Sequence, residues 1–453
     1  MTRLSNIYDI SSRGNVRGRA KQGFIRPTIC EFFDVKCDFQ EISSTPPGTL
    51  LRTLDNPNAY DTPYHPASAD RFGWSLAMSN SLVIVGTKSE DDAADGGGVG
   101  NDSGKAYIFD IVTGELLHTL DNPNAYGATT GDRFGSAVAI SESYAAVGAY
   151  LEDTDPEVIS DMGKAYIFST TTGALLHTLD APNASSSSTW RHFGNTLAIS
   201  EPYLIVGQTY TVNLDESWGK AYIYNVETGA LLQTLDNPHI FETGKSDRFA
   251  TRVAITGSYA IVSAPGEDYP TYVDTGKAYI FSTTTGVLLH TLNNPNAYGS
   301  GTDDYFGNSV AISESYSIVG AYGEDADESG GGINSGKAYI FSNSTGELLH
   351  TLDNPNPIQY FAADQFGFTV AITETHAIIS AINEYDVNGN YSGKAYIFST
   401  TTGALLHTLD NPNAAGTSFG DNFGDFLAIN NTHAVVGTPD EADGDGKVYI
   451  YSV

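Results

Sequence analysis

Acidic side chains recur along this chain in short groups, and closely spaced carboxylates can bind a cation or assist proton transfer. One group is Glu152-Asp153 with Asp155, which follows a short apolar segment. Carboxylate and amide oxygens in loops rich in Gly and Asn are the hard ligands that calcium prefers. The best candidates for calcium ligands are Asp386, Asn388, Asn390, Asp440, Asp443 and Asp445.

The other recurring acids are candidates for contact with a ligand or a partner. This group comprises Glu152, Asp153, Asp155, Glu267, Asp268, Glu324, Asp325 and Asp327. Two interpretations stay open for all these acids. They are calcium ligands, which makes calcium the candidate cofactor, or they are solvated residues that favour turns. The second interpretation is favoured, because no loop contains a complete set of ligands.

The usual sequence motifs of catalysis are missing from the chain. It contains no GxSxG, HExxH or CxxC pattern. Residues 331–337 (GGINSGK) have the spacing of a phosphate-binding loop, but no Ser or Thr follows the Lys, and the segment precedes a predicted strand. The acids are too numerous and too alike to nominate a catalytic pair. We therefore expect a protein that is not an enzyme.

The elements that position these acids are set by an internal repeat of 53 to 62 residues. Each repeat begins with a phenylalanine, at Phe72, Phe134, Phe193, Phe249, Phe306, Phe366 and Phe423. A Gly-Lys pair follows in each repeat, with its lysine at Lys105, Lys164, Lys220, Lys277, Lys337, Lys394 and Lys447. Short apolar segments between Gly, Asn and Ser turns predict strands. Seven sheets of this kind can bury one another in a ring.

Four strands are predicted in each repeat. In the repeat from Phe134 they cover residues 136–141, 144–150, 164–169 and 174–179. The first two strands form a tight hairpin, so the long acidic loops and the connections between repeats all lie at one end of the ring. We expect the seven lysines just inside this loop end, where they offset carboxylates.

A polar residue recurs once per repeat in the fourth strand. It is His118, His177, His290, His350 and His407, with Gln233 and Arg52 in the other repeats. These positions lie on the rim and are too far apart to converge, so a metal site or a catalytic site is not expected.

The two ends of the repeat array complement each other. The last repeat ends after its third strand, and an unpaired fourth strand is predicted at residues 49–54. We therefore predict an all-β protein. It is a seven-bladed β-propeller of four-stranded antiparallel blades at residues 48–453, closed by the N-terminal strand and preceded by an extended arm at residues 1–47.

The repeated segments FG…VAIS…YAAVGA…GKAYIF resemble the FG-GAP repeat family, whose units build the propellers of integrin α chains and of many microbial surface proteins. The resemblance covers about residues 48–453. It implies a seven-bladed propeller with a binding or adhesive role. Integrin-type units place a DxDxDG calcium loop between the first two strands, whereas this chain has only short turns there, so calcium is not expected at that position.

Charge and hydropathy exclude several classes of protein. The net charge is −32, which repels the phosphate backbone of nucleic acids. No apolar run approaches 18 residues, so no membrane span is expected, and the N-terminus shows no signal peptide. The only cysteines are Cys30 and Cys37, and three interpretations stay open for them, namely a disulfide, a metal site completed by other ligands, and free thiols, which we favour.

The arm at residues 1–47 is basic, unlike the acidic repeats. We expect it to anchor the propeller to protein partners in a larger assembly, through Phe24, Ile25, Phe32 and Phe33. The predicted function is a structural or interaction protein of a virion, such as a phage tail or capsid component, or of another extracellular surface assembly. Its loop end would recognise a host-surface glycan or protein. The alternatives are a secreted calcium-dependent adhesin and a polysaccharide-active enzyme.

Overall fold

The computed structural model describes most of the chain from residue 45 onward. The described residues are 45–58, 70–90, 103–124, 131–153, 161–182, 191–209, 219–239, 247–267, 275–296, 304–324, 335–357, 363–385, 391–414, 420–441 and 444–453. The chain divides into two compact units, Met1–Thr45 and Pro46–Val453. All the described strands belong to the second unit. The predicted anchoring residues Phe24, Ile25, Phe32 and Phe33 lie outside the described residues.

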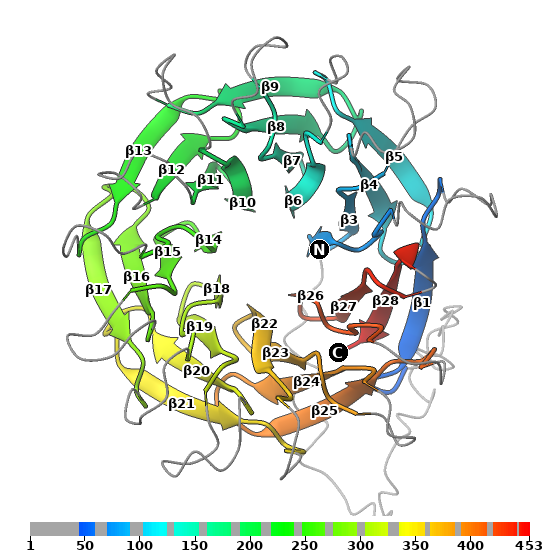
Figure 1. The fold of residues 1–453 in the computed structure, drawn as a ribbon, viewed down its shortest axis with the longest axis vertical. Helices are drawn as coiled ribbons and strands as arrows, with labels where there is room; N and C mark the ends of the chain where they lie inside the picture. The colour runs from blue at the N-terminus through cyan, green and yellow to red at the C-terminus, as the bar shows by residue number, and fades with distance from the viewer. Residues whose placement is uncertain are drawn as a thin grey trace, which may run out of the picture. The chain divides into compact units, whose positions relative to one another are not determined.

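The described strands form seven four-stranded antiparallel sheets, or blades, arranged in a ring (Figure 1). The strands nearest the axis, in blades 1 to 7, are β2 (Ser75–Met78), β6 (Phe134–Ile140), β10 (Phe193–Ser200), β14 (Val253–Ile255), β18 (Ser309–Ile312), β22 (Phe366–Ile372) and β26 (Phe426–Ile429). The second strands are β3 (Leu82–Thr87), β7 (Tyr144–Ala149), β11 (Tyr203–Gln208), β15 (Tyr259–Ala264), β19 (Tyr316–Ala321), β23 (His376–Ala381) and β27 (His433–Thr438).

The two remaining strands of each blade lie further from the axis. The third strands are β4 (Lys105–Asp110), β8 (Lys164–Ser169), β12 (Lys220–Asn225), β16 (Lys277–Ser282), β20 (Lys337–Ser342), β24 (Lys394–Ser399) and β28 (Lys447–Ser452). The outermost strands are β5 (Leu116–Asp121), β9 (Leu175–Asp180), β13 (Leu231–Asp236), β17 (Leu288–Asn293), β21 (Leu348–Asp353), β25 (Leu405–Asp410) and, in blade 7, β1 (Leu50–Asp55).

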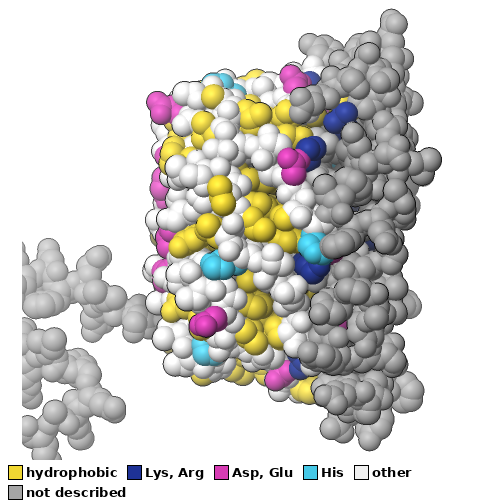
Figure 2. Space-filling model, turned by 90° about the vertical axis from the view of Figure 1, so that its left-hand side faces the viewer, with side chains coloured by type: hydrophobic (Ala, Val, Ile, Leu, Met, Phe, Trp, Pro, Cys, Tyr) yellow, Lys and Arg dark blue, Asp and Glu magenta, His cyan; other side chains and the backbone are white. Residues whose placement is uncertain are grey.

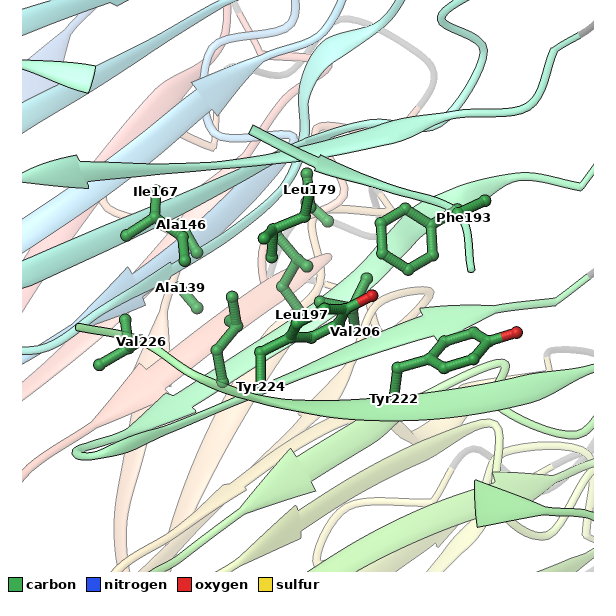
Figure 3. Close-up of a cluster of buried hydrophobic side chains, with 14 residues drawn as sticks. Ala139, Ala146, Ile167, Leu179, Phe193, Leu197, Val206, Tyr222, Tyr224 and Val226 are labelled. Atoms are coloured by element: carbon green, nitrogen blue, oxygen red, sulfur yellow. The ribbon is translucent and has the colours of Figure 1, made fainter. Parts of the chain in front are cut away.

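The hydrophobic core lies between neighbouring blades. In β8, Tyr166 and Phe168 pack against blade 1, whereas Ala165 and Ile167 pack against blade 3. This alternation arises because successive side chains of a strand point to opposite faces of the sheet. Figure 3 shows the cluster between blades 2 and 3, to which both blades contribute. Each sheet is therefore covered on both faces by neighbouring blades.

The Gly-Lys and Phe-Gly motifs mark places where neighbouring blades meet through their backbones. Gly104 precedes β4 with a φ of 78°, and a Cβ atom there would lie 1.9 Å from the carbonyl oxygen of Phe134 in blade 2. The backbone N–H of Phe134 donates to the carbonyl of Ser103 at 3.0 Å. The Phe134 ring packs against the Tyr166 ring, with 5.8 Å between the two ring centroids. Only glycine leaves room for this approach.

The ring is closed by the N-terminal strand, which confirms the prediction. Strand β1 pairs antiparallel with β28, with Leu54 opposite Val448 and Asp55 opposite Lys447. The backbone N–H of Gly48 donates to the carbonyl of Ser452 at 2.8 Å. The edge of blade 7 that would otherwise be exposed is thereby paired.

The outer face of the ring is partly apolar (Figure 2). In six outermost strands two successive leucines are exposed, namely Leu116, Leu117, Leu175, Leu176, Leu231, Leu232, Leu288, Leu289, Leu348, Leu349, Leu405 and Leu406. The ladder to the third strand shifts register beside each pair, for example between Ile108 and Phe109 in blade 1. Such bulges weaken an edge as a template for pairing with another chain.

Candidate functional site

A polar cluster, which we call the glutamate cluster, recurs at the junctions between blades. Between blades 1 and 2 it consists of Glu152, Tyr166, Asn124, Asn122 and Asp132. The Tyr166 hydroxyl donates to the Glu152 carboxylate at 2.6 Å, and Nδ2 of Asn124 donates to it at 2.7 Å. Nδ2 of Asn122 donates to Asp132 at 2.9 Å. The cluster therefore ties the loop after β5 in blade 1 to blade 2.

Turns at the ends of strands place these side chains. Asn122 follows β5, and its Oδ1 accepts the backbone N–H of Asn124 at 3.0 Å, a turn that Asn and Pro favour. Glu152 lies in the turn after β7, where its N–H donates to Ala149 at 3.2 Å and its carbonyl accepts from Gly163 at 3.0 Å. Both sides of the junction are held by the backbone before any side chain contributes.

Burial sets the protonation of the cluster. Glu152 is 1% exposed, and burial raises its pKa to about 7, although the hydrogen bonds from Tyr166 and Asn124 oppose this shift. Burial, with the nearby Asp153, raises the pKa of Asp132 to about 7. Burial and the adjacent Glu152 also raise the pKa of Tyr166, so its hydroxyl remains a hydrogen-bond donor. At neutral pH the two acids therefore titrate instead of staying fully ionised.

The same glutamate and tyrosine recur at five further junctions. The pairs are Glu90 with Tyr107, Glu267 with Tyr279, Glu324 with Tyr339, Glu384 with Tyr396 and Glu441 with Tyr449. In four of these junctions an asparagine also donates to the glutamate, from Asn58, Asn296, Asn356 and Asn413. Burial raises the pKa of Glu90, Glu324 and Glu384 as it does that of Glu152.

Three of the acids that we predicted to contact a ligand are buried inside the protein. Glu152, Glu267 and Glu324 lie inside the junctions, where each is at most 2% exposed, because a buried tyrosine hydroxyl needs an acceptor. Asp153 is half-buried and accepts the N–H of Asp161 at 3.0 Å. The remaining predicted acids Asp155, Asp268, Asp325 and Asp327 lie outside the described residues.

The predicted calcium ligands are not assembled into a site by the described residues. Asp440 accepts from Nδ2 of Asn422 at 2.7 Å and lies 3.8 Å from Nε of Arg71, and both neighbours disfavour a cation. The carbonyl of Asp445 accepts the N–H of Phe72 at 3.1 Å. Among the described residues, no group of three or more His, Cys, Asp or Glu could hold a metal. Asp386, Asn388, Asn390 and Asp443 lie outside the described residues, and calcium stays a prediction.

The repeated lysines pair with an aspartate at the end of the outermost strand. Lys164 opposite Asp180 in blade 2 is typical, because the ladder of β8 and β9 places the two residues side by side. The other pairs are Lys105–Asp121, Lys220–Asp236, Lys337–Asp353, Lys394–Asp410 and Lys447–Asp55. The expectation that these lysines offset carboxylates is confirmed.

In blade 4 the repeated lysine pairs with a glutamate, because the aspartate of the outermost strand is missing. Its outermost strand ends in Asn293, and Lys277 instead donates to Glu267 at 2.6 Å. His239 stands where other junctions have the donating asparagine, and its Nδ1 lies 3.3 Å from Glu267. The glutamate therefore gains a lysine partner where the aspartate is missing.

The polar residues of the rim connect neighbouring blades. Nε2 of His177 in blade 2 lies 2.8 Å from the carbonyl of Glu227 in blade 3, and Nε2 of His350 lies 3.1 Å from the carbonyl of Thr401. Gln233 and Arg52 make the same contact with Thr284 and Val112. These contacts give the recurring rim residue a structural role.

Comparison with known families identifies the repeats. A family model described as FG-GAP repeat matches residues 62–109, 124–168, 242–281, 297–341 and 361–398. The chain contains FG-GAP repeats. No curated protein matches the chain. No helix in the described parts of the FG-GAP propeller is long and apolar enough to cross a membrane. The FG-GAP propeller fold itself suggests a non-enzymatic interaction or adhesion domain.

The FG-GAP repeats also present one variable residue at a fixed backbone position. The residue before each opening phenylalanine has a left-handed backbone, with φ between 52° and 59°. We call these residues the variable ring, which consists of Arg71, Arg133, His192, Arg248, Tyr305, Gln365 and Asn422. All seven keep solvent contact. A left-handed conformation is uncommon outside glycine and often marks functional positions.

Because its glutamates are buried, we predict that the FG-GAP propeller is more stable at mildly acidic pH than at mildly alkaline pH. The folded state binds the Glu152 proton more tightly than the unfolded state, since burial raises this pKa from 4.5 to about 7. The contribution is complete below pH 4.5 and is lost as the pH rises through 7. Thermal unfolding should therefore show a higher melting temperature at pH 5.5 than at pH 8.

Glu152→Gln tests the source of this pH dependence. The amide keeps an acceptor for Tyr166 and Asn124 but does not ionise, so the slope of unfolding free energy between pH 5 and 8 should decrease, by at most about 1.4 kcal/mol per pH unit. Glu115→Gln is the control, because Glu115 is exposed on a turn. Equal slopes for the wild type and Glu152→Gln would contradict the buried position of this carboxyl group.

Proposed function

We propose that this FG-GAP propeller is a non-enzymatic interaction module that recognises its partner through the variable ring. The observation that carries the proposal is the variable ring itself. In seven equivalent positions the backbone is nearly identical, yet the side chains include three arginines, a histidine, a tyrosine, a glutamine and an asparagine. A rigid scaffold that presents different side chains at loop positions is typical of recognition surfaces.

The internal use of the recurring acids supports the same proposal. At six junctions the glutamate is hydrogen-bonded to a buried tyrosine. A carboxylate in this position holds two blades together, and it is not free to act on a substrate. The acids that made a polysaccharide-active enzyme an alternative therefore have another role at these junctions.

We further propose that residues 1–47 attach the propeller to a virion or another extracellular surface assembly. The support is the contrast between the basic arm and the acidic repeats. The chain enters the propeller at the rim, where the Ser452 hydroxyl donates to the carbonyl of Pro46 at 2.7 Å. In this proposal the variable ring recognises a host-surface glycan or protein.

A panel of immobilised glycans and extracellular proteins tests the recognition proposal. The triple variant Arg71→Ala, Arg133→Ala and Arg248→Ala should lose any ligand that the wild type binds, by at least about tenfold in affinity. The matched control changes three serines in the short turns at the opposite end, namely Ser81→Ala, Ser143→Ala and Ser258→Ala, and should bind normally.

Two outcomes would contradict the recognition proposal. One is a ligand whose affinity falls in the serine variant and not in the arginine variant. The other is turnover of a polysaccharide by the purified protein that a single acidic substitution abolishes. Circular dichroism of all variants shows whether the propeller is still folded.

A further inference from the structure

Two arginines of blade 4, Arg248 and Arg252, are exposed and have no acidic partner. Neither forms an ion pair in the described part of the chain, and the only hydrogen bond of the two guanidinium groups there runs from Nη1 of Arg252 to the carbonyl of Thr251 at 3.0 Å. Each described lysine, by contrast, contacts an acid or an aromatic ring. In a chain with 54 acidic and 22 basic residues, these two arginines are therefore available to an anion of another molecule.

Arg252 lies at the axis of the ring. It precedes β14, the innermost strand of blade 4, and the ladder of this three-residue strand begins only at Val253. Asp425 precedes β26, the innermost strand of blade 7, which lies across the axis from β14 (Figure 1). Desolvation by the enclosing blades lowers the pKa of the Arg252 guanidinium, and the Asp425 carboxylate opposes this shift. The two charged groups therefore face each other across the ring.

The Asp425 carboxylate is a second group that a ligand can contact. It is half-buried, and among the described residues it accepts no hydrogen bond and forms no ion pair. Burial raises its pKa to about 7 and Asp440 adds to the shift, whereas Arg252, Lys88 and Arg71 oppose it. These three cations disfavour a further positive charge beside Asp425. A neutral hydroxyl donor is therefore a better partner for this carboxylate than an ammonium group.

We infer that Arg252 and Asp425, which we call the axial pair, bind an acidic sugar of a glycan. The Arg252 guanidinium donates to the carboxylate of the sugar, and Asp425 accepts its hydroxyl groups. Arg248 belongs to the variable ring, and its carbonyl accepts the N–H of Thr251 at 3.2 Å in the turn that leads to Arg252. The axial pair therefore continues the variable ring toward the axis. This inference names the ligand class of the proposed recognition role and rests on that role.

The two opposite charges of the axial pair select among anionic ligands. Acetate and the acidic side chain of a protein have no hydroxyl group for Asp425. A zwitterionic amino acid would bring an ammonium group close to Arg71 and Lys88, and a polyanion is repelled by the net charge of −32. A sugar with one carboxylate and several hydroxyl groups meets both requirements. Arg252 and Asp425 both keep solvent contact, so no buried site has to open.

Saturation-transfer difference NMR with the full chain tests the inference. The acidic probes are 3′-sialyllactose and methyl β-D-glucuronide, and their neutral counterparts are lactose and methyl β-D-glucoside. Sodium acetate and the peptide N-acetyl-Gly-Glu-Gly-amide supply a carboxylate without hydroxyl groups. Titration of each probe gives its affinity, and the ratio between an acidic sugar and its neutral counterpart measures the contribution of the carboxylate.

Arg252→Thr and Asp425→Ser remove the two parts of the axial pair. Each change introduces the residue that another blade has at the equivalent position, namely Thr369 in blade 6 and Ser136 in blade 2, so the propeller should remain folded. Circular dichroism checks this expectation.

Arg52→Gln is the matched control for the loss of a positive charge. Arg52 lies on the rim, and Gln233 makes the same contact there in blade 3. The triple arginine variant of the variable ring is measured with the same probes, so that the ring and the axial pair are tested separately.

The wild type and Arg52→Gln should bind at least one acidic sugar about tenfold or more tightly than its neutral counterpart. Arg252→Thr should remove this preference, and Asp425→Ser should weaken binding of the acidic sugar by at least about fivefold. Loss of binding in these two variants but not in the triple variant would support the axial pair and contradict the variable ring.

Four outcomes would overturn the inference. They are no binding of either acidic sugar, equal binding of acidic and neutral sugars, binding of acetate or the acidic peptide as tight as that of the acidic sugars, and unchanged binding in folded Arg252→Thr and Asp425→Ser. If the triple variant alone loses a glycan, the recognition role of the variable ring stands and the axial pair is refuted.

Discussion

Removing residues 1–56 is expected to destabilise the propeller by more than about 5 kcal/mol, or to prevent it from folding. The deletion removes β1 and with it the ladder to β28. It takes Leu54, which is 4% exposed, out of the core between blades 7 and 1. It also leaves Lys447 without Asp55. Denaturant unfolding followed by tryptophan fluorescence measures the effect.

Removing residues 1–44 is the matched control for this deletion. It keeps the hydrogen bonds of Pro46, Gly48 and Thr49 with Ser452, so the free energy of unfolding should change by less than about 0.5 kcal/mol. The longer deletion also exposes the edge of β28, so size-exclusion chromatography should show association of the protein. Equal stability of the two deletions would contradict closure of the ring by β1.

Glu152→Ala is expected to lower the free energy of unfolding by about 2–4 kcal/mol at pH 5.5. The change leaves the Tyr166 hydroxyl and Nδ2 of Asn124 without their acceptor. The acidic pH matters because the wild-type carboxyl group is then protonated, since burial raises its pKa to about 7. The measurement therefore does not include the cost of a buried charge.

A double-mutant cycle separates this bond from other effects. Tyr166→Phe removes the hydroxyl alone, and the loss in the double variant with Glu152→Ala should be smaller than the sum of the two single losses by about 1 kcal/mol or more. Glu115→Ala, at an exposed turn, should change stability by less than about 0.5 kcal/mol. Strict additivity would mean that Glu152 and Tyr166 do not interact.

The architecture could be predicted from the sequence because the repeat carries so much of it. The opening phenylalanine and the Gly-Lys pair recur in register, and both serve the close approach of neighbouring blades, as at Gly104 and Phe134. The missing last strand and the extra first one fix the closure. The fourth strand was predicted at residues 174–179 but is Leu175–Asp180, because Asp180 stays in the ladder opposite Lys164.

The direction of the acidic side chains could not be predicted in the same way. Glu152 and Asp153 are neighbours of similar chemistry, yet one is buried against Tyr166 and the other is half-buried. The conformation of the turn after β7 decides between them, and composition does not encode it. A signal was present in the sequence. The junction between blades 2 and 3 has no glutamate at this position, and it also lacks the first asparagine and the aspartate of the cluster, which are replaced by Ala181 and Arg191. Joint replacement indicates residues that act together.

The most direct test of this account is the titration of the Glu152 carboxyl group. A 13C NMR titration of the glutamate side-chain carboxyl carbons, with Glu152→Gln to assign the resonance, gives the pKa of this group in the folded protein. Glu152 lies inside the junction of blades 1 and 2, where burial raises its pKa to about 7. A midpoint near 7 is predicted. A midpoint near 4.5, the ordinary value, would show that the carboxyl group faces solvent, and it would contradict the role of these glutamates in holding the blades together.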